Sequence, residues 1–157
     1  MITHPAIERV RAYAKEHGLD LDVRRFSEGT RTAEDAARAI GCDIAQIVKS
    51  LVFLAAGDPV VVLLSGSDRV DESKLAAALG AYSARRATAN EARERTGFVV
   101  GGVPPFGHHA PLPVIVDDGL LRHDTVWAAA GLPDAVFPIS PSDLVRLSGA
   151  TEADVRA

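Results

Sequence analysis

Apolar residues recur at helical spacing in several parts of the chain. Over residues 5–17, Ile7, Val10 and Ala14 form one apolar stripe, with Thr3 before it as a cap and Gly18 after it. Other periodic stretches also begin at a residue whose side chain can cap a helix. We therefore expect further helices over residues 32–40, 71–79, 88–96 and 140–148.

Strand-like patterns fill much of the remaining chain. The β-branched run Ile47–Ala55 and the run Val60–Leu64 flank Gly57-Asp58-Pro59, and together they predict a buried hairpin. Further strands are predicted at residues 21–26, 82–87, 98–100, 114–116, 126–129 and 136–139. Because helices and strands alternate irregularly around an antiparallel pair, the pattern favours a mixed-sheet α+β fold, with a parallel α/β sandwich as the alternative. The length of 157 residues predicts a single domain over residues 1–157.

Composition narrows the class of protein. The chain has 17 basic and 21 acidic residues and a formal net charge of -4, which excludes a strongly basic nucleic-acid binder and leaves room for a local basic patch. With one cysteine, Cys42, it has no internal disulfide framework and no cysteine-based zinc finger. No apolar run reaches the ~20 residues of a membrane span, and Met1–Pro5 does not resemble a signal peptide. We expect a cytoplasmic protein that does not associate with membranes.

The common catalytic motifs are missing. The sequence has no phosphate-binding P-loop, no G-x-G-x-x-G, no H-E-x-x-H and no G-x-S-x-G. The adjacent His108 and His109 would point in opposite directions on an extended chain, so they are not expected to bind one metal. Cys42 is interpreted as a small hydrophobic residue rather than a nucleophile. No cofactor and no metal are expected.

The most informative segment is the loop from Val100 to His108. It holds three glycines and two prolines, which excludes a regular helix or strand. Gly101, Gly102 and Val103 each carry an N–H, whereas Pro104 and Pro105 carry none. A rigid loop with exposed N–H groups suits a carbonyl oxygen or an anion. A purely structural loop between two strands is the competing interpretation.

A second signal is Lys49, which opens the most apolar strand. A lysine there must reach water or a negative partner, so it is either a site residue or a lysine that extends to the surface from an edge. Arginines are scattered along the chain, and a surface that gathers several of them could bind phosphates. The residues considered are Arg24, Arg25, Arg31, Arg69, Arg85, Arg86, Arg93 and Arg95.

Taken in order, these segments resemble the YbaK/EbsC family, also called the aminoacyl-tRNA deacylase or prolyl-tRNA-synthetase-associated editing domain. The resemblance covers roughly residues 20–148. Its most specific part is the strand Ile47-Val48-Lys49-Ser50-Leu51-Val52-Phe53, followed about fifty residues later by the loop Gly101–His108. Supporting segments are Thr32–Ala37 with Gly41, Val70-Asp71 with Lys74-Leu75, Leu79-Gly80, Thr96–Val100, Leu112–Asp117 and Ile139–Leu144.

The resemblance implies a curved mixed β-sheet surrounded by helices. It also implies trans-editing: hydrolysis of the ester between a wrong, small amino acid, such as alanine or cysteine, and the 3′-terminal adenosine of a tRNA, with tRNA-Pro as one candidate. Lys49 resembles the family's site lysine, which engages the terminal nucleotide. Gly101 and Gly102 would supply N–H groups to the carbonyl oxygen. The expected substrate-binding residues are Phe26, Thr30, Ser50, Val103, Pro104, Pro105 and His108.

Some roles stay open at this point. Phe26 is either a pocket aromatic or plain core, and His108 is a candidate without an assigned proton transfer. Some cysteine-clearing relatives carry an aspartate near the position of Val136, which this chain lacks. The expected partners are the acceptor end of an aminoacyl-tRNA and a synthetase or elongation factor; the sequence does not define the oligomeric state. Two other functions compete: a non-catalytic module that binds tRNA or a nucleotide, and an enzyme that hydrolyses a small free ester.

Overall fold

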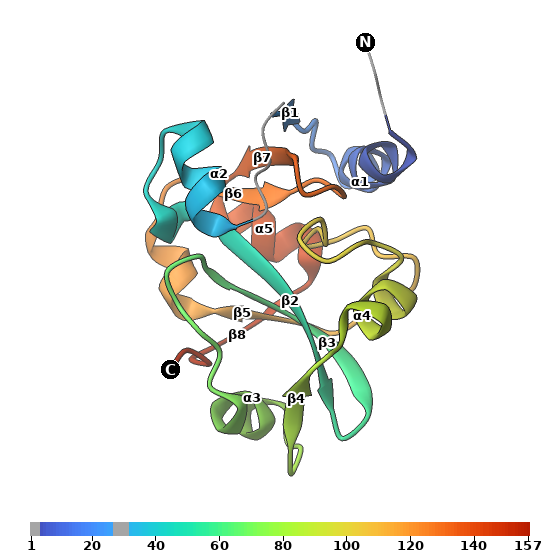
Figure 1. Ribbon diagram of the computed structural model, residues 1–157, viewed down its shortest axis with the longest axis vertical. Helices are drawn as coiled ribbons and strands as arrows, with labels where there is room; N and C mark the ends of the chain where they lie inside the picture. The colour runs from blue at the N-terminus through green and yellow to red at the C-terminus, as the bar shows by residue number, and fades with distance from the viewer. Residues whose placement is uncertain (1–3, 27–31) are drawn as a thin grey trace.

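The computed structural model describes residues 4–26 and 32–157. A long central hairpin joins a small three-stranded sheet at one end of the molecule to a helix and a short strand at the other (Figure 1). The helices are α1 (Pro5–Glu16), α2 (Ala33–Ile40), α3 (Glu72–Leu79), α4 (Ala89–Thr96) and α5 (Pro141–Ser148), with short 3-10 helices η1 (Ile44–Gln46) and η2 (Asp118–Arg122). The strands are β1 (Arg24–Arg25), β2 (Val48–Ala55), β3 (Asp58–Ser65), β4 (Ala84–Arg86), β5 (Val114–Asp117), β6 (Val126–Ala129), β7 (Ala135–Ile139) and β8 (Thr151–Ala153).

The larger sheet is mixed, with the strand order β4-β2-β3-β5-β8. β2 pairs antiparallel with β3 and β4, whereas β3–β5 and β5–β8 are parallel. Ala56 and Gly57 both have positive φ at the hairpin turn, which suits the right-handed twist of the two strands. The predicted α+β class with a mixed sheet among helices is confirmed, and the parallel sandwich is not found.

The strands divide into two sheets rather than one. The second sheet is antiparallel, in the order β1-β7-β6. A single parallel bridge between Ile47 and Trp127 connects the start of the β2 region to β6. This seam between the two sheets, with α2 beside it, lies next to the site described below.

The predicted strand at residues 98–100 is wrong. Phe98 is buried and its N–H donates to Thr96 Oγ1, while Val99 and Val100 are exposed at the start of a turn. Gly97, at φ +83°, redirects the chain after α4, so the apolar run serves to bury one ring rather than to pair with a strand. β8 was not predicted, because Thr151–Ala153 carries no apolar run.

The two faces of the hairpin pack into different cores. On one face, Val52 and Leu63 join a large cluster that includes Phe106 and Phe137. On the other face, residues such as Phe53 pack against α3. Side chains alternate along a strand, so Lys49 lies on the same face as Leu51 and Phe53. No helix in the described part of the chain has the length and hydrophobicity to cross a membrane.

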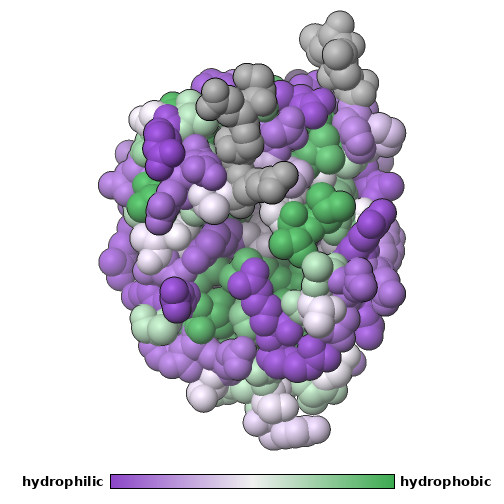
Figure 2. All heavy atoms as spheres, in the orientation of Figure 1, coloured by the Kyte–Doolittle hydropathy of each residue, from purple (hydrophilic) through white to green (hydrophobic). Residues whose placement is uncertain are grey.

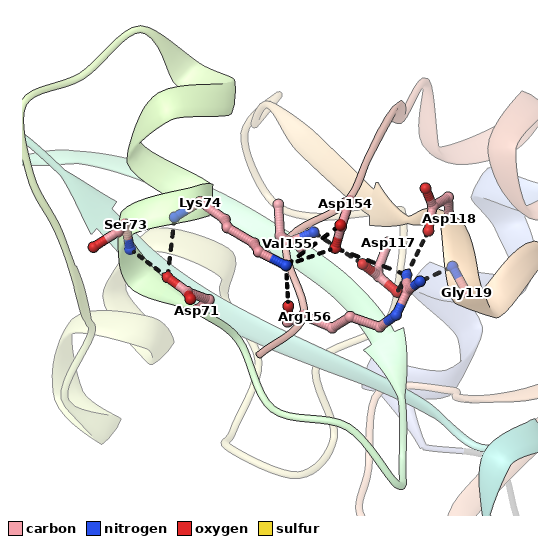
Figure 3. A network of polar contacts seen from close by, with 9 residues as sticks. All are labelled: Asp71, Ser73, Lys74, Asp117, Asp118, Gly119, Asp154, Val155 and Arg156. Atoms are coloured by element: carbon pink, nitrogen blue, oxygen red, sulfur yellow. Dashed lines mark hydrogen bonds and ion pairs between the residues drawn. The ribbon is translucent and has the colours of Figure 1, made fainter.

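A polar network fastens the end of the chain to the larger sheet (Figure 3). The fully buried carboxylate of Asp117 accepts hydrogen bonds from the N–H groups of Val155 (2.9 Å) and Gly119 (3.0 Å). It also pairs with Arg156 at 3.0 Å, and Arg156 binds Asp118 as well. The residues after β8 are thereby held against the end of β5.

Candidate active site

The structure contains a cavity of about 370 Å³ beside the first half of β2. β4 pairs with Phe53–Ala55, and the N–H of Ala87 donates to the Val52 carbonyl. Among the described residues, no strand pairs with this side of β2 at residues 48–51. α2, α4, the second sheet and the loop after α4 enclose the space. Its volume lies within the usual range for small-molecule sites.

Most of the cavity wall is apolar. Figure 2 shows hydrophobic residues gathered near the centre of one face, over β2 and the adjoining loop, within a hydrophilic rim. The apolar lining consists of Ala33, Ala36, Ile47, Val48, Leu51, Val52, Ala87, Ala89, Ala92, Val100, Val103, Trp127, Ala129, Pro133 and Val136. The small alanine side chains make room for a compact apolar group.

Lys49 lines this cavity at the start of β2. Its side chain is partly buried, and its Nζ donates to the backbone carbonyl of Asp68. Burial lowers the pKa of Lys49; the Asp68 carboxylate opposes this shift, and the nearby Arg86 and Arg69 add to it. The ammonium group is thus held by a neutral carbonyl while other cations lie close to it. Such an arrangement suits an incoming anion.

The glycine-proline loop supplies another part of the wall. Gly101 and Val103 line the cavity, and Gly101 has φ +87°, a conformation that favours glycine. Among the described residues, no acceptor takes a hydrogen bond from the N–H of Gly101 or of Val103. Gly102 differs, because its N–H donates to the Val99 carbonyl at 2.9 Å. The structure therefore favours Gly101 and Val103, rather than Gly102, as the free donors.

Gly102 has a packing role in this structure. An added Cβ would lie 2.8 Å from the carbonyl oxygen of Gly131 and 2.8 Å from the Leu132 Cα. The loop thus packs backbone against backbone on the turn before β7. Only a residue without a side chain permits this close approach, which positions Gly101 over the cavity.

Pro104, Pro105 and His108 do not line the cavity. Both prolines are buried, and His108 Nε2 donates to the Pro104 carbonyl at 2.7 Å. The His108 ring also makes an edge contact with Phe98. Burial lowers the pKa of His108; the bond to the Pro104 carbonyl opposes this shift, and repulsion from His109 adds to it. In this structure His108 stabilises the loop through its hydrogen bond to the Pro104 carbonyl.

The lowered pKa of His108 predicts a loss of stability in mild acid. The unfolded chain binds a proton near pH 6.5, whereas the folded chain does so only at lower pH, so the free energy of unfolding falls as the pH drops through 6.5. We expect His108→Gln, whose amide can still donate to Pro104, to show a smaller fall between pH 7.5 and 5.5. Denaturant unfolding at each pH measures this, and parallel curves for the two proteins would contradict it.

The remaining predicted site residues fall in different places. Ser50 lines the cavity, and its Oγ is buried without a hydrogen-bond partner among the described residues. Phe26 is partly buried and its N–H donates to Asp134 O at 2.9 Å, but it does not line the cavity. Thr30 lies outside the described residues. Lys49, Ser50, Gly101 and Val103 are therefore the predicted residues that the structure brings together.

Several lining residues were not expected from the sequence. Trp127, from β6, lies in the wall, with the guanidinium of Arg24 4.9 Å above its ring. Thr32, which caps α2, and Arg86 complete the polar lining. Arg86 belonged to the arginines noted in the sequence, but nothing in its local pattern distinguished it from the others. No group of three His, Cys, Asp or Glu side chains in the described ranges is arranged to hold a metal.

Comparison with known proteins places this geometry in context. Residues 27–147 match the family model of the aminoacyl-tRNA editing domain. The chain is 33% identical to the uncharacterized protein YwhH of Bacillus subtilis over 144 residues, covering 91% of each chain. It is 29% identical to the multifunctional Ser/Thr-tRNA deacylase ProXp-y of Escherichia coli, over 94% of this chain and 89% of that one.

The solved structures agree with these relatives. A crystal structure described as a candidate trans-editing enzyme for prolyl tRNA synthetase superposes with a TM-score of 0.93, at 42% identity over 99% of both chains. The match covers the strand that carries Lys49 and the loop that carries Gly101, both of which line the cavity. The chain belongs to the aminoacyl-tRNA editing domain family.

Proposed function

We propose that this protein hydrolyses, in trans, the ester that joins a wrongly attached small amino acid to the 3′-terminal adenosine of a tRNA. The proposal is supported by one observation: Lys49, Gly101 and Val103 line the same cavity, and the N–H groups of Gly101 and Val103 have no acceptor among the described residues. Lys49 offers a cation for a phosphate, and the two N–H groups offer donors for a carbonyl oxygen. The aminoacylated end of a tRNA carries both groups close together.

Hydrolysis of the ester requires the protein mainly to position the carbonyl group and to stabilise its negative charge. The N–H groups of Gly101 and Val103 stabilise the negative charge that develops on the carbonyl oxygen of the ester as water attacks the carbonyl carbon. The bond from that carbon to the ribose 3′-oxygen then breaks, and the ribose oxygen takes up a proton. An ester is already activated, so no protein nucleophile is required. We assign no general base among the side chains and leave proton transfer to water or the 2′-hydroxyl.

The cavity supports a small amino acid as the substrate. Ala33, Ala36, Ala129 and Val136 give the cavity an apolar wall, which suits a small side chain without polar groups. Editing of such residues is needed because a synthetase pocket gains only ~1–3 kcal/mol of discrimination per methylene. Because relatives include segments of proline–tRNA ligases and a candidate trans-editing enzyme for prolyl tRNA synthetase, tRNA-Pro is the first tRNA to test.

A panel of mischarged tRNAs tests the proposal directly. We expect release of alanine or another small residue from at least one tRNA, with correctly charged tRNA spared. Binding without release would favour the non-catalytic module, and release from a free amino-acid ester without tRNA would favour a small-ester hydrolase. Given the net charge of -4, we expect weak, salt-sensitive tRNA binding, which a synthetase or elongation factor can supplement.

The two glycines of the loop should respond differently to substitution. Gly101→Ala leaves room for the methyl group, 3.6 Å from the Pro133 ring, but strains a backbone at φ +87° and shifts the N–H. We expect kcat to fall about tenfold, since the oxyanion contact tightens in the transition state. Gly102→Ala should instead lower the free energy of unfolding by about 1–3 kcal/mol, because its methyl group meets the Gly131 backbone.

Single-turnover deacylation and denaturant unfolding separate these effects. His108→Ala serves as the comparison, since His108 lies outside the cavity and its activity loss should be smaller than that of Gly101→Ala. A His108 variant without activity beside a fully active Gly101 variant would overturn the mechanism in favour of histidine acid–base catalysis.

A further inference from the structure

Two arginines, Arg69 and Arg86, lie near Lys49; the three cations are referred to below as the basic cluster. Lys49 and Arg86 both line the cavity. Arg69 follows Asp68, whose carbonyl oxygen accepts the hydrogen bond from Lys49 Nζ. Both arginines are close enough to Lys49 to lower its pKa by charge repulsion. The cluster is thus continuous from the cavity wall to the exposed loop before α3.

The basic cluster is poorly neutralised by the protein itself. Within the described part of the chain, none of its three members forms an ion pair with a carboxylate within 4.0 Å. The arginines that do are Arg24, Arg25, Arg38, Arg85, Arg146 and Arg156. Among the described residues, the Asp68 carboxylate alone acts on Lys49 by its charge. Each arginine repels the Lys49 ammonium group, and a bound anion would relieve that repulsion.

The neighbouring residues Arg85 and Arg86 differ in whether a carboxylate neutralises them. Arg85 faces α4, where Glu91 pairs with it at 2.9 Å and the pKa of Glu91 falls to about 2. Arg86 is opposite Phe53 in the β2–β4 pairing. Phe53 and Lys49 lie four residues apart on one strand, so Arg86 projects from the same face of the sheet as Lys49. The sheet geometry therefore directs Arg86, and not Arg85, to the cluster.

Resting on the proposed function, we propose that Arg69 and Arg86 bind the backbone phosphates of the nucleotides that precede the terminal adenosine. The 3′ strand would then leave the cavity over β4 and the loop before α3. Contacts to phosphates fix position without reading sequence, and each one adds to the salt dependence of binding. In a chain of net charge -4, a local cluster gives the RNA one preferred route.

Substitution with glutamine tests the two arginines while retaining a polar side chain at each position. We would prepare Arg69→Gln, Arg86→Gln and the double variant, with Arg122→Gln as the matched control. Arg122 lies at the end of η2, has no ion pair in the described structure and does not line the cavity. All four chains would be compared with the unaltered protein on alanyl-tRNA-Pro and on 3′-O-alanyl-adenosine, which has no phosphate.

On the tRNA we expect each arginine variant to lose about tenfold in kcat/KM. The slope of log kcat/KM against log salt should become shallower by about 1 for each arginine removed. Hydrolysis of 3′-O-alanyl-adenosine should not change in Arg69→Gln, and in Arg86→Gln, which alters the cavity lining, it should fall much less than the reaction on tRNA. Arg122→Gln should behave like the unaltered protein on both substrates. An equal loss on both substrates would place the arginines at the ester and overturn the inference.

A binding measurement keeps this inference separate from the proposed function. Filter binding of a single-stranded RNA ending in CCA requires no hydrolysis, and we expect it to weaken about tenfold in each arginine variant, with the same change in salt slope. If the unaltered protein releases no amino acid from any tRNA but the variants bind this RNA less tightly, the function fails and the phosphate site stands. If RNA binding is the same in all variants, the phosphate site fails whatever the activity.

Discussion

Lys49→Ala is expected to lower kcat/KM for a mischarged tRNA by roughly 10–150-fold, which corresponds to ~1.5–3 kcal/mol for a charge-assisted contact. Lys49 is the member of the basic cluster that lines the cavity and donates to the Asp68 carbonyl. Removing it takes a cation out of the cavity wall. The fold should persist, because alanine removes a partly buried charge rather than a packed apolar side chain.

Single-turnover deacylation, with circular dichroism to verify folding, measures this effect. Lys15→Ala is the matched control, since Lys15 is an exposed lysine in the last turn of α1. Lys49→Arg should retain part of the activity, because it keeps the charge with a different head-group geometry. A folded Lys49→Ala protein that deacylates at the unaltered rate would make Lys49 a structural residue and remove the cation from the mechanism.

Asp117→Ala is expected to cause the largest loss of stability, about 3–5 kcal/mol. The variant leaves the N–H groups of Val155 and Gly119 without their acceptor and removes the buried partner of Arg156. A loss of that size corresponds to a drop in Tm of roughly 6–20 °C for a chain of this length. Thermal and denaturant unfolding measure it.

The exposed members of the same network provide the control. Asp154 pairs with Lys74 at 3.3 Å with half of its side chain exposed, so Asp154→Ala should cost about 1 kcal/mol or less. Asp117→Asn should lie between the two, since an amide keeps one acceptor oxygen. Equal effects for Asp117→Ala and Asp154→Ala would show that burial does not set the strength of this network.

The sequence predicted the elements that local chemistry determines. Caps at Thr32, Asp71, Thr88 and Ser140 begin helices where expected, and each of them accepts a backbone N–H. The hairpin also follows from its β-branched runs. The division into two sheets was not predictable, because it depends on a bridge between Ile47 and Trp127, which are far apart in the sequence and carry no local signal.

The site was predicted where residue type and position both restrict the role. A lysine that opens an apolar strand must reach water or an anion, and a loop rich in glycine and proline must adopt an irregular, rigid backbone. The sequence could not distinguish Gly101 from Gly102, because the difference is whether an N–H meets the Val99 carbonyl and whether the backbone of Gly131 lies 2.8 Å away. The sequence also could not distinguish Arg86 from Arg85. Their roles depend on the face of β4 from which each side chain projects.

The position of Trp127 gives this protein a built-in optical probe. It is the sole tryptophan among the 157 residues, and it stands in the cavity wall with a guanidinium above its ring. Fluorescence excited selectively at the indole therefore reports on one known location, the cavity wall. A nucleotide or an ester entering the cavity changes the surroundings of that ring, so its emission can follow occupancy in real time on unlabelled protein.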